Sequence, residues 1–225
     1  MIRRDYIIDQ VERFAAVLAE ILGFTKKGEW QNASATVAEE FQRLIGVDAP
    51  QALQMSDTEL FARLIQGGPT HVVENRGFML ATLLKAAGDI EAGLGRIEAS
   101  RQCFLKGLHL LLDTLDGTAI GERPDFAATI EAFSIALRDS PLPTKTQALL
   151  MRHYERSGEF GKAEDALYAI AEAEPASAEL LEFGAAFYQR LLSRSDAALT
   201  AGNLSRAEAE AGLADFRAKV DVPRN

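Results

Sequence analysis

Three basic residues, Lys145, Arg152 and Arg156, are spaced seven and four positions apart in a stretch with helical periodicity. At about 100° per residue, this spacing places them within a stripe roughly 40° wide on one face of a helix. A row of cations can hold an acidic peptide or a C-terminal carboxylate through charge-assisted hydrogen bonds. The alternative is a solvated face whose charges are balanced by Glu155 and Glu159. Both interpretations stand, and the three basic residues are the candidate peptide-binding residues.

The remaining residues that carry chemistry form no catalytic or metal-binding pattern in the sequence. His71, His109 and His153 lie far apart, without a second His, a Cys or a paired carboxylate at ligand spacing. No nucleophile elbow, dinucleotide-binding turn or Walker loop is present. The single cysteine, Cys103, lies in an apolar helical pattern, which predicts a buried, inert thiol. We expect no catalytic residue, no cofactor and no metal, and therefore a protein that is not an enzyme.

Composition limits the classes of partner. The 225 residues include 24 Lys and Arg against 33 Asp and Glu, which gives a net charge of -9, and no basic block stands out. Because binding to phosphate backbones needs a basic stripe, nucleic acid is not an expected partner. No run approaches the roughly 20 apolar residues of a membrane span, and charged residues interrupt any signal-peptide core near the start. We expect a cytoplasmic protein that does not bind membranes.

A short pattern recurs along the chain: a Gly, a large apolar residue two positions later, and an Ala five positions later. It occurs at 28–33, 158–163 and 202–207, with a looser copy at 88–92. Gly can adopt the left-handed conformation that ends a helix, and the large apolar residue fills the corner that follows. In this interpretation, Trp30 is a corner residue, like Phe160 and Leu204. The pattern predicts antiparallel helical hairpins with tight elbows.

Helical periodicity accounts for most of the remaining chain, and no alternating run is long enough for a sheet. The predicted helices cover 5–23, 31–45, 60–65, 72–87, 95–115, 126–137, 144–157, a stretch ending before Pro175, one long helix from Ser177, and one from Ser205. Helix starts are marked by capping boxes. These are Ser56 with Glu59, Thr144 with Gln147, and Ser205 with Glu208.

Residues 144–177 resemble a tetratricopeptide repeat. The matching positions are Leu150, Tyr154, Gly158, Ala163, Leu167 and Pro175, and the departures are Gln147, Met151 and Ile170. Together with 1–7, 158–165 and 187–202, this unit resembles a family of uncharacterised bacterial tetratricopeptide-like proteins. The resemblance implies a tetratricopeptide-like array of antiparallel hairpins, an α-α superhelix in which the first helix of each repeat lines a concave groove. It implies a bacterial cytoplasmic setting and no assigned activity.

These observations predict one all-α helical-repeat domain over 1–225, with atypical N-terminal helices at 1–70 and tetratricopeptide-like hairpins at 71–225. The expected function is a non-enzymatic module or scaffold that binds a protein or an acidic peptide. The alternative is a structural homo-oligomer that assembles through its first helix. That helix is apolar over more than one stripe, and Phe14 is its expected contact. An enzyme of unrecognised type is the third candidate.

Overall fold

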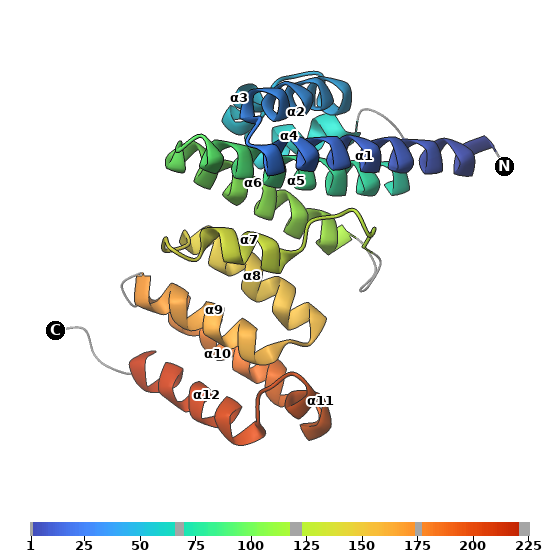
Figure 1. Ribbon diagram of the computed structural model, residues 1–225. Coiled ribbons are helices and arrows are strands. Elements are labelled where there is room, and N and C mark those ends of the chain that lie inside the picture. The colour runs from blue at the N-terminus through green and yellow to red at the C-terminus, as the bar shows by residue number, and fades with distance from the viewer. Residues whose placement is uncertain (1, 66–69, 118–122, 174–176, 221–225) are drawn as a thin grey trace. The chain divides into compact units, whose positions relative to one another are not determined.

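The computed structural model describes residues 2–65, 70–117, 123–173 and 177–220, and Figure 1 shows their arrangement. These residues are helical with no strand, so the all-α prediction is confirmed. The helices are α1 (Ile2–Lys27), α2 (Trp30–Ile45), α3 (Ala49–Gln54), α4 (Asp57–Ile65), α5 (Thr70–Gly93), α6 (Ile97–Gly117), α7 (Ile130–Leu137), α8 (Thr144–Ser157), α9 (Phe160–Ala173), α10 (Ala178–Leu192), α11 (Asp196–Ala201) and α12 (Arg206–Val220). The chain divides into two compact units after Pro141. The expectation of a single domain over 1–225 stays a prediction.

The N-terminal unit is built around α5 and α6, which lie side by side and are joined by a short turn at 94–96 (Figure 1). Helix α2 packs on α5, and α1 packs on both α2 and α5. Helix α4 contacts α5 and α6, while α7 contacts α6. The core consists of large apolar side chains from these helices, including Phe14, Phe41, Phe78, Leu84, Leu108 and Phe133. A layer of helices thus covers the central pair.

The C-terminal unit contains the α8–α9 hairpin and the packed pair α10 and α12. Glycines allow the two helices of this pair to approach closely. A Cβ on Gly184 would lie 2.3 Å from the ring of Phe216, and one on Gly212 would lie 2.2 Å from the ring of Tyr188. Tyr188 is fully buried and donates its hydroxyl to Oε1 of Glu164 at 2.7 Å. The pair therefore has no room for larger residues at either glycine.

The two elbows of the C-terminal unit also contact each other. The backbone N–H of Gly161 donates to the carbonyl of Gly202 at 2.9 Å. A Cβ on Gly202 would lie 2.4 Å from the carbonyl oxygen of Gly158 and 2.4 Å from the ring of Phe160. The recurring Gly pattern thus makes a contact between hairpins as well as a turn within each one.

Several predicted helix ends are confirmed. Gly28, Gly46 and Gly158 adopt left-handed conformations with φ of 74°, 70° and 80°. Two capping boxes form, because the N–H groups of Ser56 and Ser205 donate to the carboxylates of Glu59 and Glu208, whose own N–H groups donate back to the serine hydroxyls. Ser177 caps α10 by accepting from the N–H of Leu180 at 3.1 Å. The predicted stops at 67–69 and at Pro175 lie outside the described residues.

One predicted elbow is wrong, and another forms with a different left-handed residue. Gly88 lies inside α5, where the ring of Phe104 occupies the space that a Cβ would fill, at 2.3 Å. The turn falls later, at Gly95, which has a φ of 76°. At 202–207 the left-handed residue is Asn203, with φ of 59°, whereas Gly202 has φ of -84°. Gly202 is needed for space, because its Cβ would collide with the neighbouring elbow.

Other predicted boundaries are also corrected. Helix α7 starts at Ile130 instead of residue 126, because the Thr129 hydroxyl accepts from the N–H of Ala132 at 3.0 Å. The Thr144 capping box does not form, since Pro143 is the N-cap and Thr144 is already helical. The long helix from Ser177 is interrupted after Leu192, where Ser195 caps the separate helix α11. Helix α3 was not expected from the sequence. Ala207, expected at a close helix contact, is exposed.

Candidate functional site

The predicted basic stripe lies on α8, and two of its three residues line a groove. Lys145 and Arg152 are exposed, and both belong to the walls of a hollow of about 430 Å³ in the C-terminal unit. Arg156 lies on the same helix but is not among the groove-lining residues. The structure therefore brings Lys145 and Arg152 together at a candidate binding site and leaves Arg156 beyond its edge.

The groove lies between α8 and α10, and its walls are mostly apolar between the charged groups. Helix α8 contributes Ala148, Leu149 and Met151, while α10 contributes Phe183. Phe183 is 45% exposed, which is unusual for a large apolar side chain. An exposed aromatic ring beside cationic side chains is suited to a ligand that has both an apolar group and an acidic group.

Arg190, on α10, is a groove residue that the sequence reasoning missed. Its Nε and one Nη donate to the two carboxylate oxygens of Glu155 at 2.7 and 2.8 Å, and this hydrogen bonding raises the pKa of Arg190. Two of the five N–H donors of the guanidinium are used in this way. Glu155 was expected to balance cations on its own helix, and it also binds Arg190 across the groove. Three cationic side chains thus line the groove with one carboxylate.

Glu159, the other expected balancing charge, lies outside the groove lining. Its carboxylate binds the ammonium of Lys162 and accepts from the Ser157 hydroxyl at 3.2 Å. The hydrogen bond with Lys162 holds the pKa of Glu159 below its ordinary value, although burial opposes this. Glu159 therefore belongs to the elbow between α8 and α9.

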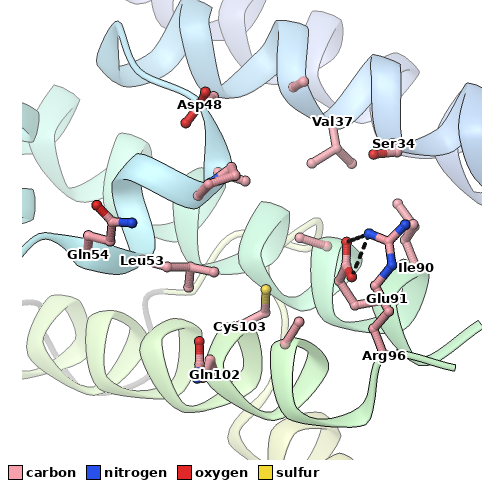
Figure 2. A pocket seen from close by; sticks show the side chains of 15 residues that line it. Ser34, Val37, Asp48, Leu53, Gln54, Ile90, Glu91, Arg96, Gln102 and Cys103 are labelled. Atoms are coloured by element: carbon pink, nitrogen blue, oxygen red, sulfur yellow. Dashed lines mark hydrogen bonds and ion pairs between the residues drawn. The ribbon is translucent and has the colours of Figure 1, made fainter. Parts of the chain in front are cut away.

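A second hollow, of about 520 Å³, lies in the N-terminal unit (Figure 2). Its walls come from α2 and α3 on one side and from α5 and α6 on the other. Val37 and Leu53 extend into the space from the first wall, and the thiol of Cys103 forms part of the second (Figure 2). No single segment of the sequence indicates this cavity, because four helices and the residues between them are needed to enclose it.

Polar groups lie at the two ends of this cavity (Figure 2). At one end, Oδ1 of Asp48 accepts from the N–H of Gln51 at 2.9 Å and so caps α3. At the other end, the carboxylate of Glu91 accepts from Arg96 at 3.2 and 3.3 Å. Between the two charged ends the lining is mostly apolar, and Val37, Leu53 and Ile90 belong to it.

Cys103 is buried as predicted, with 2% of its surface exposed. Burial, with a smaller effect of the Glu91 charge, raises the pKa of the thiol to about 12. The thiol is therefore neutral at physiological pH, which agrees with the prediction of an inert cysteine. The ring of Trp30 lies against Gly93 at the end of α5, where a Cβ would meet it at 2.5 Å, and its role in the corner between α1 and α2 stays a prediction.

His109 and His153 lie in different units of the chain. Nδ1 of His109 lies 3.6 Å from Asp57, whose other oxygen is 3.1 Å from the ammonium of Lys106. His153 stacks edge to face on Tyr154, and the side chain of His71 lies outside the described residues. Within the part of the chain that the structure describes, no group of three or more acidic, His or Cys side chains could hold a metal ion. Among the same residues, no helix combines the length and apolar character needed to span a membrane.

Comparison with known proteins gives a family without an activity. No curated protein and no solved structure matches the chain. The expectation of an uncharacterised family is confirmed, whereas no tetratricopeptide relationship accompanies the match. The matching family model covers residues 1–221, and the chain therefore belongs to the family of unknown function DUF6483.

Proposed function

We propose that this protein is a non-enzymatic interaction module that binds an acidic protein segment in the groove between α8 and α10. The observation that supports this proposal is the combination of Lys145, Arg152 and Arg190 with an exposed apolar ring, Phe183. Cations on a chain of net charge -9 are a local attraction for an anionic partner. The groove combines a charged rim with an apolar contact, as protein interfaces do.

The two kinds of contact have different roles in this proposal. Each exposed charge pair contributes only about 0.2–1 kcal/mol, so the cations select acidic ligands more than they hold them. Burial of apolar surface against Phe183 and Leu149 adds affinity at about 25 cal/mol per Å². A matching ligand therefore has an apolar side chain beside a carboxylate, and its binding weakens with added salt.

Labelled eight-residue peptides provide the test. One set combines Glu with Leu or Phe, and matched sets replace Glu with Gln or Lys. Fluorescence anisotropy should show tighter binding of the acidic set. Replacing both Lys145 and Arg152 with Glu should weaken that binding about tenfold, because two attractions become repulsions. Arg217→Glu, an exposed change on α12, is the matched control outside the groove. Arg156→Glu changes a stripe residue that does not line the groove, so it should weaken peptide binding less than the double variant does.

Two outcomes would contradict this function. The first is equal affinity for the acidic and the neutral peptide sets. The second is unchanged affinity in the double variant while its circular dichroism spectrum matches that of the parent protein. Either result would mean that the cations do not select the ligand.

Self-assembly through α1 is a second candidate function, and it has an observation of its own. Ile8 and Leu22 are 45% and 56% exposed, and Ala15 between them is exposed too. They are spaced seven residues apart, so all three lie on one side of α1, over about 21 Å of helix. A seven-residue repeat is typical of a helix that pairs with another helix. The expected contact Phe14 is wrong, because this residue is fully buried and packs edge to face on Phe126.

Light scattering over a range of concentrations tests this second candidate. If α1 pairs with its copy in another molecule, Ile8→Glu combined with Leu22→Glu should lower the dimer fraction. Ile97→Glu, at another highly exposed apolar residue of the same unit, should leave it unchanged. A monomer at every concentration would refute self-assembly while leaving the groove proposal intact.

We also propose that the helical hairpins are arranged as a tetratricopeptide-like superhelix. The contact between the elbows at Gly161 and Gly202 supports hairpins stacked in a tetratricopeptide-like array. An extended superhelix over the full chain predicts an elongated scattering profile, whereas a compact profile would contradict it. A cytoplasmic setting is proposed with it and is testable by fractionation of cells that make the protein.

A further inference from the structure

The cavity of the N-terminal unit has the size of a small-molecule site. Its volume of about 520 Å³ is within the roughly 300–1,000 Å³ that is common for ligand pockets. Val37 and Leu53 line it from one wall and Ile90 from the other. Small side chains keep the space open at Ala38, Ala49, Ala87 and Ala99. A ligand that occupied this space would bury an apolar body against several helices.

The charges at its ends favour a cation over an anion. Glu91 is paired with Arg96, so these two groups largely neutralise each other. Asp48, at the opposite end, accepts one backbone hydrogen bond from Gln51 and has no ion pair that the structure records. Two carboxylates and one guanidinium thus line the cavity, and the excess negative charge lies at the Asp48 end.

The thiol in the cavity wall shows how its surroundings act on a charge at this position. Cys103 ionises only with difficulty, because burial and the charge of Glu91 both disfavour a negative charge at this position and raise its pKa. Burial disfavours a charge of either sign in the middle of the cavity, whereas the charge of Glu91, the smaller of the two effects, disfavours an anion alone. Because the lining carries an excess of negative charge at the Asp48 end, an apolar cation is favoured there over a fatty acid or another apolar anion.

We infer that this cavity binds a small molecule with an apolar body and a cationic end, with the cation beside Asp48. The apolar body lies against Val37, Leu53 and Ile90. This site is separate from the groove of the C-terminal unit and does not depend on the function proposed for that groove.

Three eight-carbon test molecules separate the contributions of chain and charge: octylammonium, octanol and octanoate. Trp30 is the only tryptophan in the chain. Its ring packs on Gly93, one helical turn from Ile90 in the cavity wall, so its fluorescence should report binding. We expect octylammonium to bind about tenfold more tightly than octanoate, with octanol between them. All three should also slow the alkylation of Cys103 by N-ethylmaleimide when they are bound.

Matched variants locate the site. Asp48→Asn keeps a residue that caps helices as well as Asp does, and it removes the charge, so octylammonium should lose its advantage over octanol. Ala99→Leu and Ala38→Leu fill the cavity from opposite walls and should weaken binding of all three molecules at least tenfold. Ala16→Leu, at an exposed position on α1 outside the cavity, should leave binding unchanged.

These binding measurements either support or overturn a cation site beside Asp48. The expected order of affinities, its loss in Asp48→Asn and weaker binding in a folded cavity-filling variant would together support it. Tighter binding of octanoate, equal binding of all three molecules, or no response at both Trp30 and Cys103 would overturn it. So would a charge preference that survives in Asp48→Asn, or full affinity in either filled variant with an unchanged circular dichroism spectrum.

Discussion

Gly212, on α12, provides a direct test of how the C-terminal unit is packed. Gly212→Ala adds a Cβ that would lie 2.2 Å from Cζ and 2.5 Å from Oη of Tyr188. Carbon atoms in contact are about 3.5–4.0 Å apart, so the helix or the ring has to move by more than about 1 Å. The ring is constrained, because Tyr188 is fully buried and packs on Phe187 and Phe216.

Two opposing effects set the size of the change. Alanine favours a helix over glycine by about 1 kcal/mol. Overpacking costs about 1–3 kcal/mol, and the severe overlap, together with disturbance of the Tyr188–Glu164 hydrogen bond, places this case at the upper end. The expected net effect is a loss of about 2 kcal/mol in the free energy of unfolding. With a urea dependence of about 2 kcal/mol per M, the midpoint should fall by about 1 M.

Urea unfolding followed by circular dichroism measures this change, and Gly23→Ala is the control. Gly23 lies within α1, and a Cβ there would have nothing within 4 Å. This control should therefore stabilise the protein by up to about 1 kcal/mol through helix propensity alone. If Gly212→Ala also stabilises the protein, the space beside Tyr188 is not filled in the way described and the reasoning is refuted.

Three further predictions follow from individual side chains. Burial raises the pKa of Glu164 above its ordinary 4.5, so its contribution to stability is greatest below that value and falls as the pH rises. The hydroxyl of Tyr188 donates to the carboxylate of Glu164 and opposes the rise in its pKa. Tyr188→Phe removes this hydroxyl, and urea unfolding should show that the free energy of unfolding falls by about 1.5 kcal/mol at pH 7 and by less at pH 4. An equal loss at both pH values would contradict this. Ser177→Ala removes the cap of α10 and should cost about 1 kcal/mol in the same assay, whereas Ser177→Asp should cost little. The pKa of about 12 for Cys103, against an ordinary 9.0, implies roughly 10³-fold less thiolate at pH 8, so iodoacetamide should alkylate Cys103 far more slowly than free cysteine. Alkylation at the rate of free cysteine would show that the thiol is not protected.

Features that depend on neighbouring residues could be predicted from the sequence. The left-handed glycines at 28, 46 and 158 end helices through their own backbone freedom, and the capping boxes at Ser56 and Ser205 form within three residues. Thr144 shows the limit of such rules, because Pro143 before it takes the N-cap position and leaves the threonine inside the helix. Local patterns thus predicted many boundaries, though not the choice between adjacent cap residues.

Features that depend on packing could not be predicted in this way. Gly88 appeared to be a turn residue, yet its position is set by the ring of Phe104, which arrives from the next helix. Arg190 reaches Glu155 from 35 residues away, so the pairing of charges in the groove was invisible in the spacing along α8. The cavity beside Cys103 needs four helices to enclose it. For these cases, the relevant neighbour is distant in sequence.

The hydrogen bond from Gly161 to Gly202 has a consequence for amide exchange. Gly161 lies in the first turn of α9, where backbone N–H groups have no partner within the helix and normally exchange quickly with solvent. Here that N–H is held by the carbonyl of the other elbow, so its exchange requires the two hairpins to separate. The protection of this one amide in deuterated water therefore measures how firmly the hairpins dock. It gives the opening free energy of that contact without any mutation.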